Sequence, residues 1–320
     1  MRYIVIPKGI SAEIFHSQII ERFNGTEFKF LSYDKEQSLV TNLSDLSCVM
    51  DGDIIYFRSV TDFFRFSLGN IFFTKKVIKE FDFRGIISEE SYLRFGSKTR
   101  RMLLRWLEYF SFKYADRLFA VSNNLANYLR KKYYSRDVTV IPCCVPSDFC
   151  VLKTTPSSHE EMRFIYLGSM SKWQAFSKVC ELYSGINTEL KTLTVITNDT
   201  VTANQMLNKY TIKAKVISGD KKIVLEQLDQ ADFGFIYRTN CKINTTASPV
   251  KFLEYTARGV IPVMSEYVGD YSETFKKYSY TIKNGEEKID IKKLVKLRSD
   301  QATYRALFKL TNQYVWEEYF

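Results

Sequence analysis

Short apolar runs rich in β-branched and aromatic residues recur along the chain, separated by segments whose apolar residues are spaced for one face of a helix. In the first half this pattern predicts strands at 3–7, 53–58, 85–87, 118–122 and 138–142, and helices at 11–23, 71–81, 97–117 and 123–134. In the second half it predicts strands at 163–168, 192–197, 215–218, 233–237 and 260–264, and helices at 174–185, 202–210, 222–230 and 249–258. Such alternation is typical of parallel sheets covered by helices.

A polar stretch at residues 150–161, which contains Pro156, interrupts this alternation. We therefore expect an N-terminal Rossmann-like domain at 1–152 and a C-terminal one at 153–320, with the last helix packing back on the N-terminal domain. The expected fold class is α/β, with two doubly wound domains facing across a cleft. Ligands of open parallel sheets bind beyond the carboxyl ends of the strands, so we expect them in that cleft.

Composition and charge narrow the function classes. The chain of 320 residues is 45% hydrophobic and 26% charged, which excludes a largely disordered protein. Its net charge of +10 is spread evenly, with 22 Lys/Arg and 17 Asp/Glu in residues 1–150 and 24 and 19 in the rest. No nucleic-acid module is recognisable, so we expect no nucleic-acid partner. A nucleotide's phosphates and an anionic membrane surface both remain suitable partners.

The N-terminal residues, the lack of a long apolar run and the cysteine spacing together predict a cytoplasmic protein. Residues 1–10 read as a first strand and not as a secretory signal, and no run of about 18 apolar residues predicts a transmembrane helix. The six cysteines lack the spacing of a zinc site, so we expect free buried thiols in a reducing compartment.

Residues 231–266 carry the clearest chemical pattern. A strand, a polar loop, a helix and a second strand follow one another, and Ser248-Pro249 stands where the helix opens. Serine is a good N-cap and proline suits the first helical position. The free N–H groups at such a helix start suit a diphosphate.

Three charged residues surround this predicted helix start. Arg238 follows the preceding strand, and Lys251 lies in the first turn, where a cation is unfavourable to the helix dipole unless an anion binds nearby. Glu254 lies one turn later, where a carboxylate can accept two hydrogen bonds from a ribose diol. The set predicts a site for a nucleoside diphosphate.

This segment resembles the donor-binding segment of family 4 glycosyltransferases, which are retaining enzymes of the GT-B fold. It is most similar to the branch found in bacterial capsule and O-antigen pathways, whose pattern is R…N…ASPxKFxEYxAxGxPV. The matching positions, with one extra residue after the glycine, are Arg238, Asn244, Ala247, Ser248, Pro249, Lys251, Phe252, Glu254, Tyr255, Ala257, Gly259, Pro262 and Val263. Weaker similarity covers nearly the whole chain, at 3–9, 55–60, 81–91, 114–133, 138–146 and 164–174.

The resemblance implies a glycosyltransferase that uses a nucleotide-diphosphate sugar, with UDP-sugar favoured over GDP-sugar, and neither metal nor cofactor. It implies catalytic roles for Arg238, Lys251, Glu254 and Arg84. The implied donor-binding residues are Gly168, Ser169, Lys172, Asn244, Ser248, Pro249, Val250 and Tyr255. The string Asp51-Gly52-Asp53 is similar to a metal-binding motif, but it precedes a predicted strand and we interpret it as a turn.

The sequence departs from the family pattern at three positions. Thr246 stands where many members have the first of two glutamates, and Ser169 and Gln174 stand where many have the arginine and lysine of the phosphate loop. We expect Arg238 and Lys251 to supply the phosphate cations instead. Whether Lys172 also substitutes stays open.

The first domain is expected to select the acceptor, a glycan that we expect to be lipid-linked. Arg84 lies in the loop where the family often has a functional histidine, and Gly9 follows the first strand, where a small residue permits close approach. Glu89 and Glu90 could orient a sugar hydroxyl, or could simply begin a solvated helix.

Residues 97–117 contain six Lys/Arg and two acids, with Leu103, Leu107, Phe110 and Tyr114 on one face. One interpretation is peripheral contact with an anionic membrane, at the inner face of the cytoplasmic membrane. The other is a surface helix that packs on its leucine face and leaves its charges in water.

The sequence thus predicts a retaining glycosyltransferase of bacterial surface polysaccharide synthesis. Two alternatives stay open: a non-catalytic GT-B-like protein that binds nucleotide or glycan, and a sugar-nucleotide epimerase.

Overall fold

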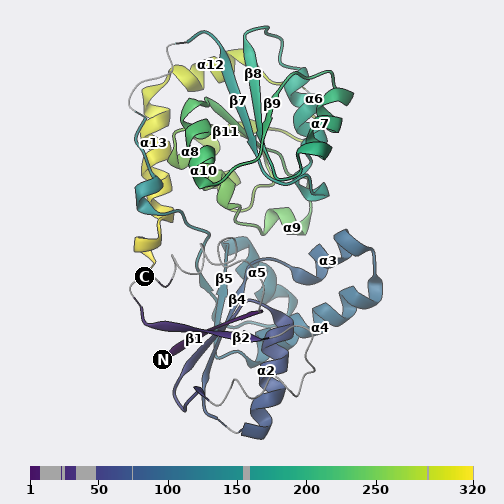
Figure 1. Ribbon diagram of the computed structural model, residues 1–320, viewed down its shortest axis with the longest axis vertical. Helices are drawn as coiled ribbons and strands as arrows, with labels where there is room; N and C mark the ends of the chain where they lie inside the picture. The colour runs from purple at the N-terminus through teal and green to yellow at the C-terminus, as the bar shows by residue number, and fades with distance from the viewer. Residues whose placement is uncertain are drawn as a thin grey trace. The chain divides into compact units, whose positions relative to one another are not determined.

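The computed structural model describes residues 1–7, 23, 26–33, 48–73, 75–153, 159–286 and 288–319 (Figure 1). The chain forms two compact units, divided between Pro142 and Cys143. Each unit holds a six-stranded sheet, and every described strand pair within the two sheets is parallel. The predicted α/β class with two parallel sheets is therefore confirmed.

The first unit has the strand order β2-β1-β3-β4-β5-β6. Its strands are β1 (Arg2–Pro7), β2 (Phe28–Tyr33), β3 (Ile54–Phe57), β4 (Ile78–Phe83), β5 (Arg117–Ala120) and β6 (Thr139–Val140). Its described helices are α2 (Val60–Phe73), α3 (Ile87–Phe95), α4 (Lys98–Tyr114) and α5 (Asn123–Lys132). Aromatic side chains fill the space between α2 and the sheet. The centre of the Phe63 ring lies 5.2 Å from that of Phe57 and 5.5 Å from that of Phe81.

Two predicted elements of this unit are wrong. The expected helix at 71–81 is the end of α2 followed by strand β4, and the expected strand at 85–87 is the loop into α3. Charges within β4 hid it, because Glu80 interrupts the apolar run expected of a buried strand. The Glu80 carboxylate accepts hydrogen bonds from Arg2 at 3.3 Å and from Arg117 at 3.1 Å, so the charge is paired inside the fold. The predicted helix at 11–23 lies, except for residue 23, outside the described residues.

The second unit has the order β12-β11-β10-β7-β8-β9. Its strands are β7 (Met162–Leu167), β8 (Lys191–Ile196), β9 (Lys215–Ile217), β10 (Phe233–Ile236), β11 (Ile261–Ser265) and β12 (Tyr280–Ile282). Its helices are α6 (Phe176–Ser184), α7 (Thr200–Lys209), α8 (Lys221–Gln230), α9 (Lys242–Thr245), α10 (Val250–Ala257), α11 (Tyr271–Thr274), α12 (Ile291–Ser299) and α13 (Gln301–Thr311). The chain winds outward from β7 in one direction and from β10 in the other, so the strand order reverses between these two neighbours. Such a switch point is where open α/β sheets bind ligands.

The division after Pro142 differs from the expected boundary at residue 152. The backbone N–H of Val145 donates to the Tyr314 carbonyl at 3.0 Å, and that of Val151 donates to the Ala257 carbonyl at 2.7 Å. These bonds tie the stretch after Pro142 to the second unit.

The last long helix, α13, also belongs to the second unit. It packs against α10, where the Thr311 hydroxyl donates to the Thr256 hydroxyl at 2.7 Å. None of the helices in the described ranges is long and apolar enough to cross a membrane. None of the six cysteines, which all lie in the described ranges, forms a disulfide; Cys48 is exposed and Cys150 and Cys241 are partly exposed, contrary to the expectation that all are buried.

Candidate functional site

A tyrosine hydroxyl separates the two central strands of the second sheet at their carboxyl ends. The Tyr255 hydroxyl of α10 accepts a hydrogen bond from the Leu167 N–H of β7 at 2.8 Å and donates to the Phe235 carbonyl of β10 at 3.2 Å. The β7–β10 pairing ends at Phe235 and Tyr166, so the hydroxyl takes the place of the next rung. Gly234 makes room for it, because a Cβ there would lie 2.6 Å from the Tyr255 ring. The switch point is thereby held open.

Gly168 begins the loop beyond β7 and lies against the first turn of α10. Its φ of +152° is strained for other residues, and a Cβ there would lie 2.6 Å from Gln174 Oε1 and 2.9 Å from Lys251 Nζ. Lys251 donates to Gln174 Oε1, and its ammonium lies 4.9 Å from the centre of the Tyr166 ring. Burial, together with the nearby Arg238 charge, holds the pKa of Lys251 well below its usual range.

Ser169 lies in the same loop and is held by Gln174. The Gln174 amide donates to the Ser169 hydroxyl at 3.1 Å, and the Tyr166 hydroxyl donates to the Ser169 carbonyl at 2.9 Å. Gln174 therefore joins the loop to Lys251, at the position where the resembled family often has a lysine.

Arg238, which follows β10, supplies a second cation at the same edge. Its backbone is fixed by Ser265, whose hydroxyl accepts from the Arg238 N–H at 2.9 Å and donates to the Arg238 carbonyl at 2.7 Å. The guanidinium is buried and donates to the Trp173 carbonyl at 3.3 Å and to Asn244 Oδ1 at 3.5 Å. Its Nε has no hydrogen-bond partner among the described residues, and burial lowers its pKa.

Arg238 and Lys251 thus share one feature: neither forms a salt bridge with any carboxylate in the described part of the chain. Desolvation of an unpaired cation is costly. Two such cations side by side at a switch point indicate a site for an anion of more than one charge.

The start of α10 differs from the prediction in one respect. Pro249 is the N-cap residue, Val250 is the first helical residue, and no side chain caps the helix. Ser248 does not act as the N-cap, because its buried hydroxyl accepts the Cys143 N–H at 3.0 Å and bonds the Tyr271 hydroxyl at 2.7 Å. The Phe252 N–H donates to the Pro249 carbonyl at 3.0 Å, whereas the Val250 and Lys251 N–H groups have no partner among the described residues and are left to an anion.

Glu254 lies one turn further along α10. It is half-buried, and burial raises the pKa of its carboxyl to about 7, although the charges of Lys251 and Lys221 act in the opposite direction. Beyond the same ends of β7 and β8 lies a pocket of about 430 Å³. Its lining residues are Leu167, Gly168, Ser169, Ile196, Thr197, Asn198, Asp199, Gly219 and Val224.

The remaining residues predicted for the donor side are placed as follows. Asn244 is buried, and its amide donates to the Thr239 carbonyl at 2.9 Å. Lys172 is exposed, and its ammonium contacts no acceptor or carboxylate within the described ranges. Thr246, at the position of the family's first glutamate, donates to the Lys242 carbonyl at 2.8 Å.

The predicted acceptor-side residues belong to the first unit. Arg84 follows β4 and pairs with buried Asp82 at 3.5 Å. Glu89 pairs with Arg101 at 2.7 Å and Arg105 at 2.9 Å, and these bonds outweigh burial and hold its pKa below the usual range.

Glu90, next to it, is exposed, and its carboxylate reaches Gly85, where a Cβ would lie 2.3 Å from Oε1. Gly9 lies outside the described residues. Asp51 and Gly52 form a turn, and the Asp53 carboxylate accepts the Met50 N–H at 2.7 Å, as the interpretation of this string as a turn requires. Across the described ranges no group of three or more His, Cys, Asp or Glu could hold a metal ion.

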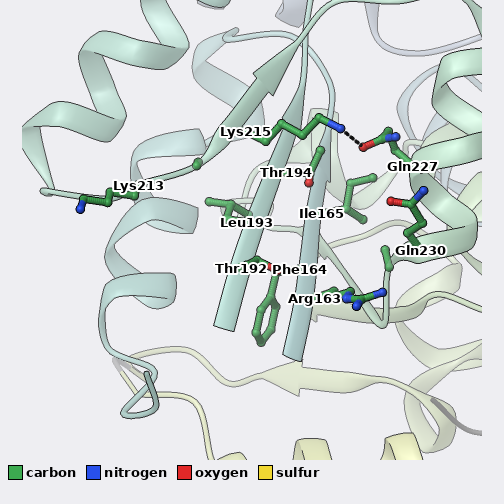
Figure 2. A pocket seen from close by; sticks show the side chains of 12 residues that line it. Arg163, Phe164, Ile165, Thr192, Leu193, Thr194, Lys213, Lys215, Gln227 and Gln230 are labelled. Carbon is green, nitrogen blue, oxygen red and sulfur yellow. Dashed lines mark hydrogen bonds between the residues drawn. The ribbon is translucent and has the colours of Figure 1, made fainter. Parts of the chain in front are cut away.

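A second pocket of the same unit, of about 540 Å³, lies over the opposite half of the strands (Figure 2). Thr192 and Thr194 of β8 line it together with Gln227 of α8, which accepts a hydrogen bond from Lys215 at 2.9 Å. Because ligands of open sheets bind at the carboxyl ends, and this pocket lies toward the amino ends, we do not assign the anion site to it.

Sequence reasoning missed Gln174 and Tyr166 as members of the site. The only signal for Gln174 was its position, where the resembled family has a phosphate-loop lysine. Tyr166 gave none, because a tyrosine near the end of a buried strand reads as core.

No protein-family model and no curated protein matches the sequence. Solved structures do match over nearly the whole chain. Anabaena HepE in complex with UDP and glucose matches with a TM-score of 0.73 at 10% identity, covering 99% of this chain and 96% of that one. Sucrose-phosphate synthase from Thermosynechococcus elongatus matches with a TM-score of 0.66 at 12% identity, covering 99% and 95%. The lipopolysaccharide outer core galactosyltransferase WaaB matches with a TM-score of 0.64 at 12% identity, covering 98% and 96%. These identities show a shared fold, and the chain has the fold of the GT-B glycosyltransferases.

Proposed function

We propose that this protein is a glycosyltransferase that takes a sugar from a nucleotide-diphosphate donor. The observation that carries the proposal is the pair of cations at the switch point of the second sheet, buried Arg238 and half-buried Lys251, which have no carboxylate partner among the described residues. A diphosphate would supply the missing negative charge to both. Among the proteins of similar fold, HepE was solved with UDP and glucose, and WaaB is named a galactosyltransferase.

Each part of the donor has a partner in this arrangement. The diphosphate binds between Arg238, Lys251 and the uncapped start of α10. The nucleoside occupies the pocket beyond β7 and β8, and the ribose diol donates to Glu254. We propose UDP-sugar over GDP-sugar, and neither metal nor cofactor.

The chemistry follows from the leaving group. Negative charge grows on the diphosphate as the glycosidic bond breaks, and preorganised cations and N–H groups stabilise that charge where it develops. We propose retention of configuration, as the resemblance to family 4 implies, with the acceptor hydroxyl losing its proton to the departing phosphate. No protein nucleophile is assigned.

We also propose the finer setting that the resemblance implies. The acceptor is a lipid-linked glycan, selected by the first unit with Arg84, Glu89 and Glu90. The pathway is bacterial capsule or O-antigen synthesis. The protein is cytoplasmic and contacts the inner face of the cytoplasmic membrane through residues 97–117.

A thermal-shift panel of UDP, GDP, CMP and their sugars tests the donor class. At about 100 times its Kd a ligand adds about 2.7 kcal/mol to the free energy of unfolding, so UDP and one UDP-sugar should raise the Tm by several degrees, and GDP and CMP by less. Product analysis then separates the alternatives. Conversion of the sugar without an acceptor indicates an epimerase, and tight binding without any consumption indicates a non-catalytic protein.

Replacing Lys251 by methionine should separate function from stability. Lys251→Met removes a desolvated cation that has only the neutral Gln174 oxygen as acceptor, so the Tm of the unliganded protein should stay level or rise, while UDP affinity falls about 100-fold. Lys178→Met is the matched control, because Lys178 of α6 is another partly exposed lysine of the same unit and pairs with Glu181 at 2.5 Å. Calorimetric titration and melting curves measure both quantities. If UDP-sugar turnover survives both Lys251→Met and Arg238→Ala, the phosphate site is misassigned.

The raised pKa of Glu254 predicts a pH-dependent donor affinity. The ionised carboxylate accepts both ribose hydroxyls, so UDP-glucose should bind more tightly as the pH rises through about 7 and level off above it. The unliganded protein should show the opposite trend: because the folded-state pKa exceeds the usual 4.5, the contribution of this group to stability is lost as the pH rises through about 7. Titrations at pH 5.5 to 8.5 (roughly one and a half units either side of the pKa) measure this. Glu254→Gln should bind more weakly with a flat profile, and an unchanged slope in this variant contradicts the assignment.

A further inference from the structure

Helices α3 and α4 of the first unit form a helical hairpin that extends away from the sheet (Figure 1). None of residues 89–106 is buried, and the burial of α4 begins at Leu107. We call residues 89–106 the hairpin tip. Gly96 ends α3 in a left-handed conformation, and Ser97 caps α4 by accepting the Arg100 N–H at 3.3 Å. Gly96 and Ser97 therefore form the turn between the two helices.

The hairpin tip exposes large apolar side chains. The exposed fractions are 41% for Leu93, 54% for Phe95, 69% for Met102, 58% for Leu103 and 48% for Trp106. Apolar side chains left in water lose the stabilisation that burial gives, so several of them on one helical hairpin indicate a contact surface. The alternative of a helix that packs on its leucine face holds for Leu107, which is buried, and for Phe110, which contacts Phe63 and Phe64 of α2, but not for exposed Leu103. The apolar surface continues beyond the part that packs.

Contacts with α2 and ion pairs between α3 and α4 fix the position of the hairpin tip. The Trp106 ring lies edge-on to Phe64 of α2 at 5.2 Å and packs against Phe110 at 5.7 Å. Glu89 ties α3 to α4 through its pairs with Arg101 and Arg105. The exposed side chains therefore lie on two helices that are held together by ion pairs and held to α2 by aromatic contacts.

Cations surround this apolar surface. The hairpin tip contains Arg94, Lys98, Arg100, Arg101 and Arg105 against two acids, Glu89 and Glu90. The guanidinium groups of Arg94 and Arg100 lie 5.2 Å and 4.6 Å from the centre of the exposed Phe95 ring. Apolar and aromatic side chains flanked by Lys and Arg are the composition of helices that lie in an anionic lipid–water interface.

We propose that the hairpin tip inserts into the headgroup region of an anionic bilayer. Met102, Leu103 and Phe95 enter the acyl boundary, Trp106 lies at the interface, and Arg94, Lys98 and Arg100 bind lipid phosphates. The proposal rests on the proposed function for its setting, a lipid-linked acceptor, and it adds the inserting residues and the required lipid charge. A protein partner would need an acidic rim around an apolar pocket, whereas an anionic bilayer supplies both without a fixed shape.

Flotation with vesicles tests this with the full chain. Vesicles of phosphatidylcholine alone are compared with vesicles that also contain phosphatidylglycerol. The wild type should bind the anionic vesicles at least about tenfold more strongly, and its tryptophan emission should shift to the blue. Met102→Ser with Leu103→Ser should weaken binding about tenfold, and Trp106→Phe should abolish most of the emission shift. Lys98→Glu should also weaken binding, although an acid at the first helical position favours α4 itself.

The matched control is Leu190→Ser with Val201→Ser, which removes two apolar side chains of the second unit that are 52% and 67% exposed. This variant should bind as the wild type does. Equal binding to both vesicles, or wild-type binding by the Met102/Leu103 variant, overturns the proposal. So does a wild type that elutes as an oligomer while the Met102/Leu103 variant is monomeric, because another copy then covers the surface. Thermal shifts with UDP on the same variants test the two proposals separately. Vesicle binding without UDP binding would contradict the proposed function but not the membrane proposal.

Discussion

The second unit depends on one hydroxyl group placed between two strands. Parallel strands β7 and β10 are hydrogen-bonded through their buried halves, and a continued ladder would close the sheet where its strand order reverses. The Tyr255 hydroxyl bonds Leu167 and Phe235 instead, and Gly234 leaves the space for its ring. The ends of β7 and β10 are thus joined through a side-chain hydroxyl and not through the sheet ladder. Lys251 lies on the same helix as Tyr255, and its ammonium lies at the opening between these strand ends, against Gln174 and Tyr166.

The opening holds charge that the fold itself does not neutralise. Gln174 and the Tyr166 ring offer Lys251 only a neutral acceptor and a π face, and Arg238 has backbone and amide oxygens around it. This arrangement lowers the pKa of both cations, which is unfavourable for stability. A bound diphosphate would oppose the effect, because its negative charge stabilises the charged form of each group. Under the proposed function, the unliganded site is therefore prepared for an anion before the donor arrives.

The sequence predicted more of this unit than of the other. In the second unit apolar strands and amphipathic helices alternate without interruption, and the strands and helices predicted between residues 163 and 264 all occur, with small shifts at their ends. In the first unit β4 was missed, since Glu80 and Asp82 lie within a buried strand, where Glu80 pairs with Arg2 and Arg117 and Asp82 accepts a hydrogen bond from Tyr56, all distant in the chain. No local pattern can show such pairing.

Within the site, the local motif placed Arg238, Lys251 and Glu254 around one helix start. It misread Ser248, whose hydroxyl bonds Cys143 and Tyr271 instead of capping α10. It could not show Gln174 or Tyr166, because these residues are distant in the chain and come into contact with Lys251 only when the sheet forms.

A crystal structure of the protein with UDP is the most direct measurement of the central claim. We predict that the diphosphate lies within hydrogen-bonding distance of the Arg238 guanidinium, the Lys251 ammonium and the first N–H groups of α10. A diphosphate held elsewhere, for example by Lys172 with Lys251 still bonded to Gln174, would contradict it.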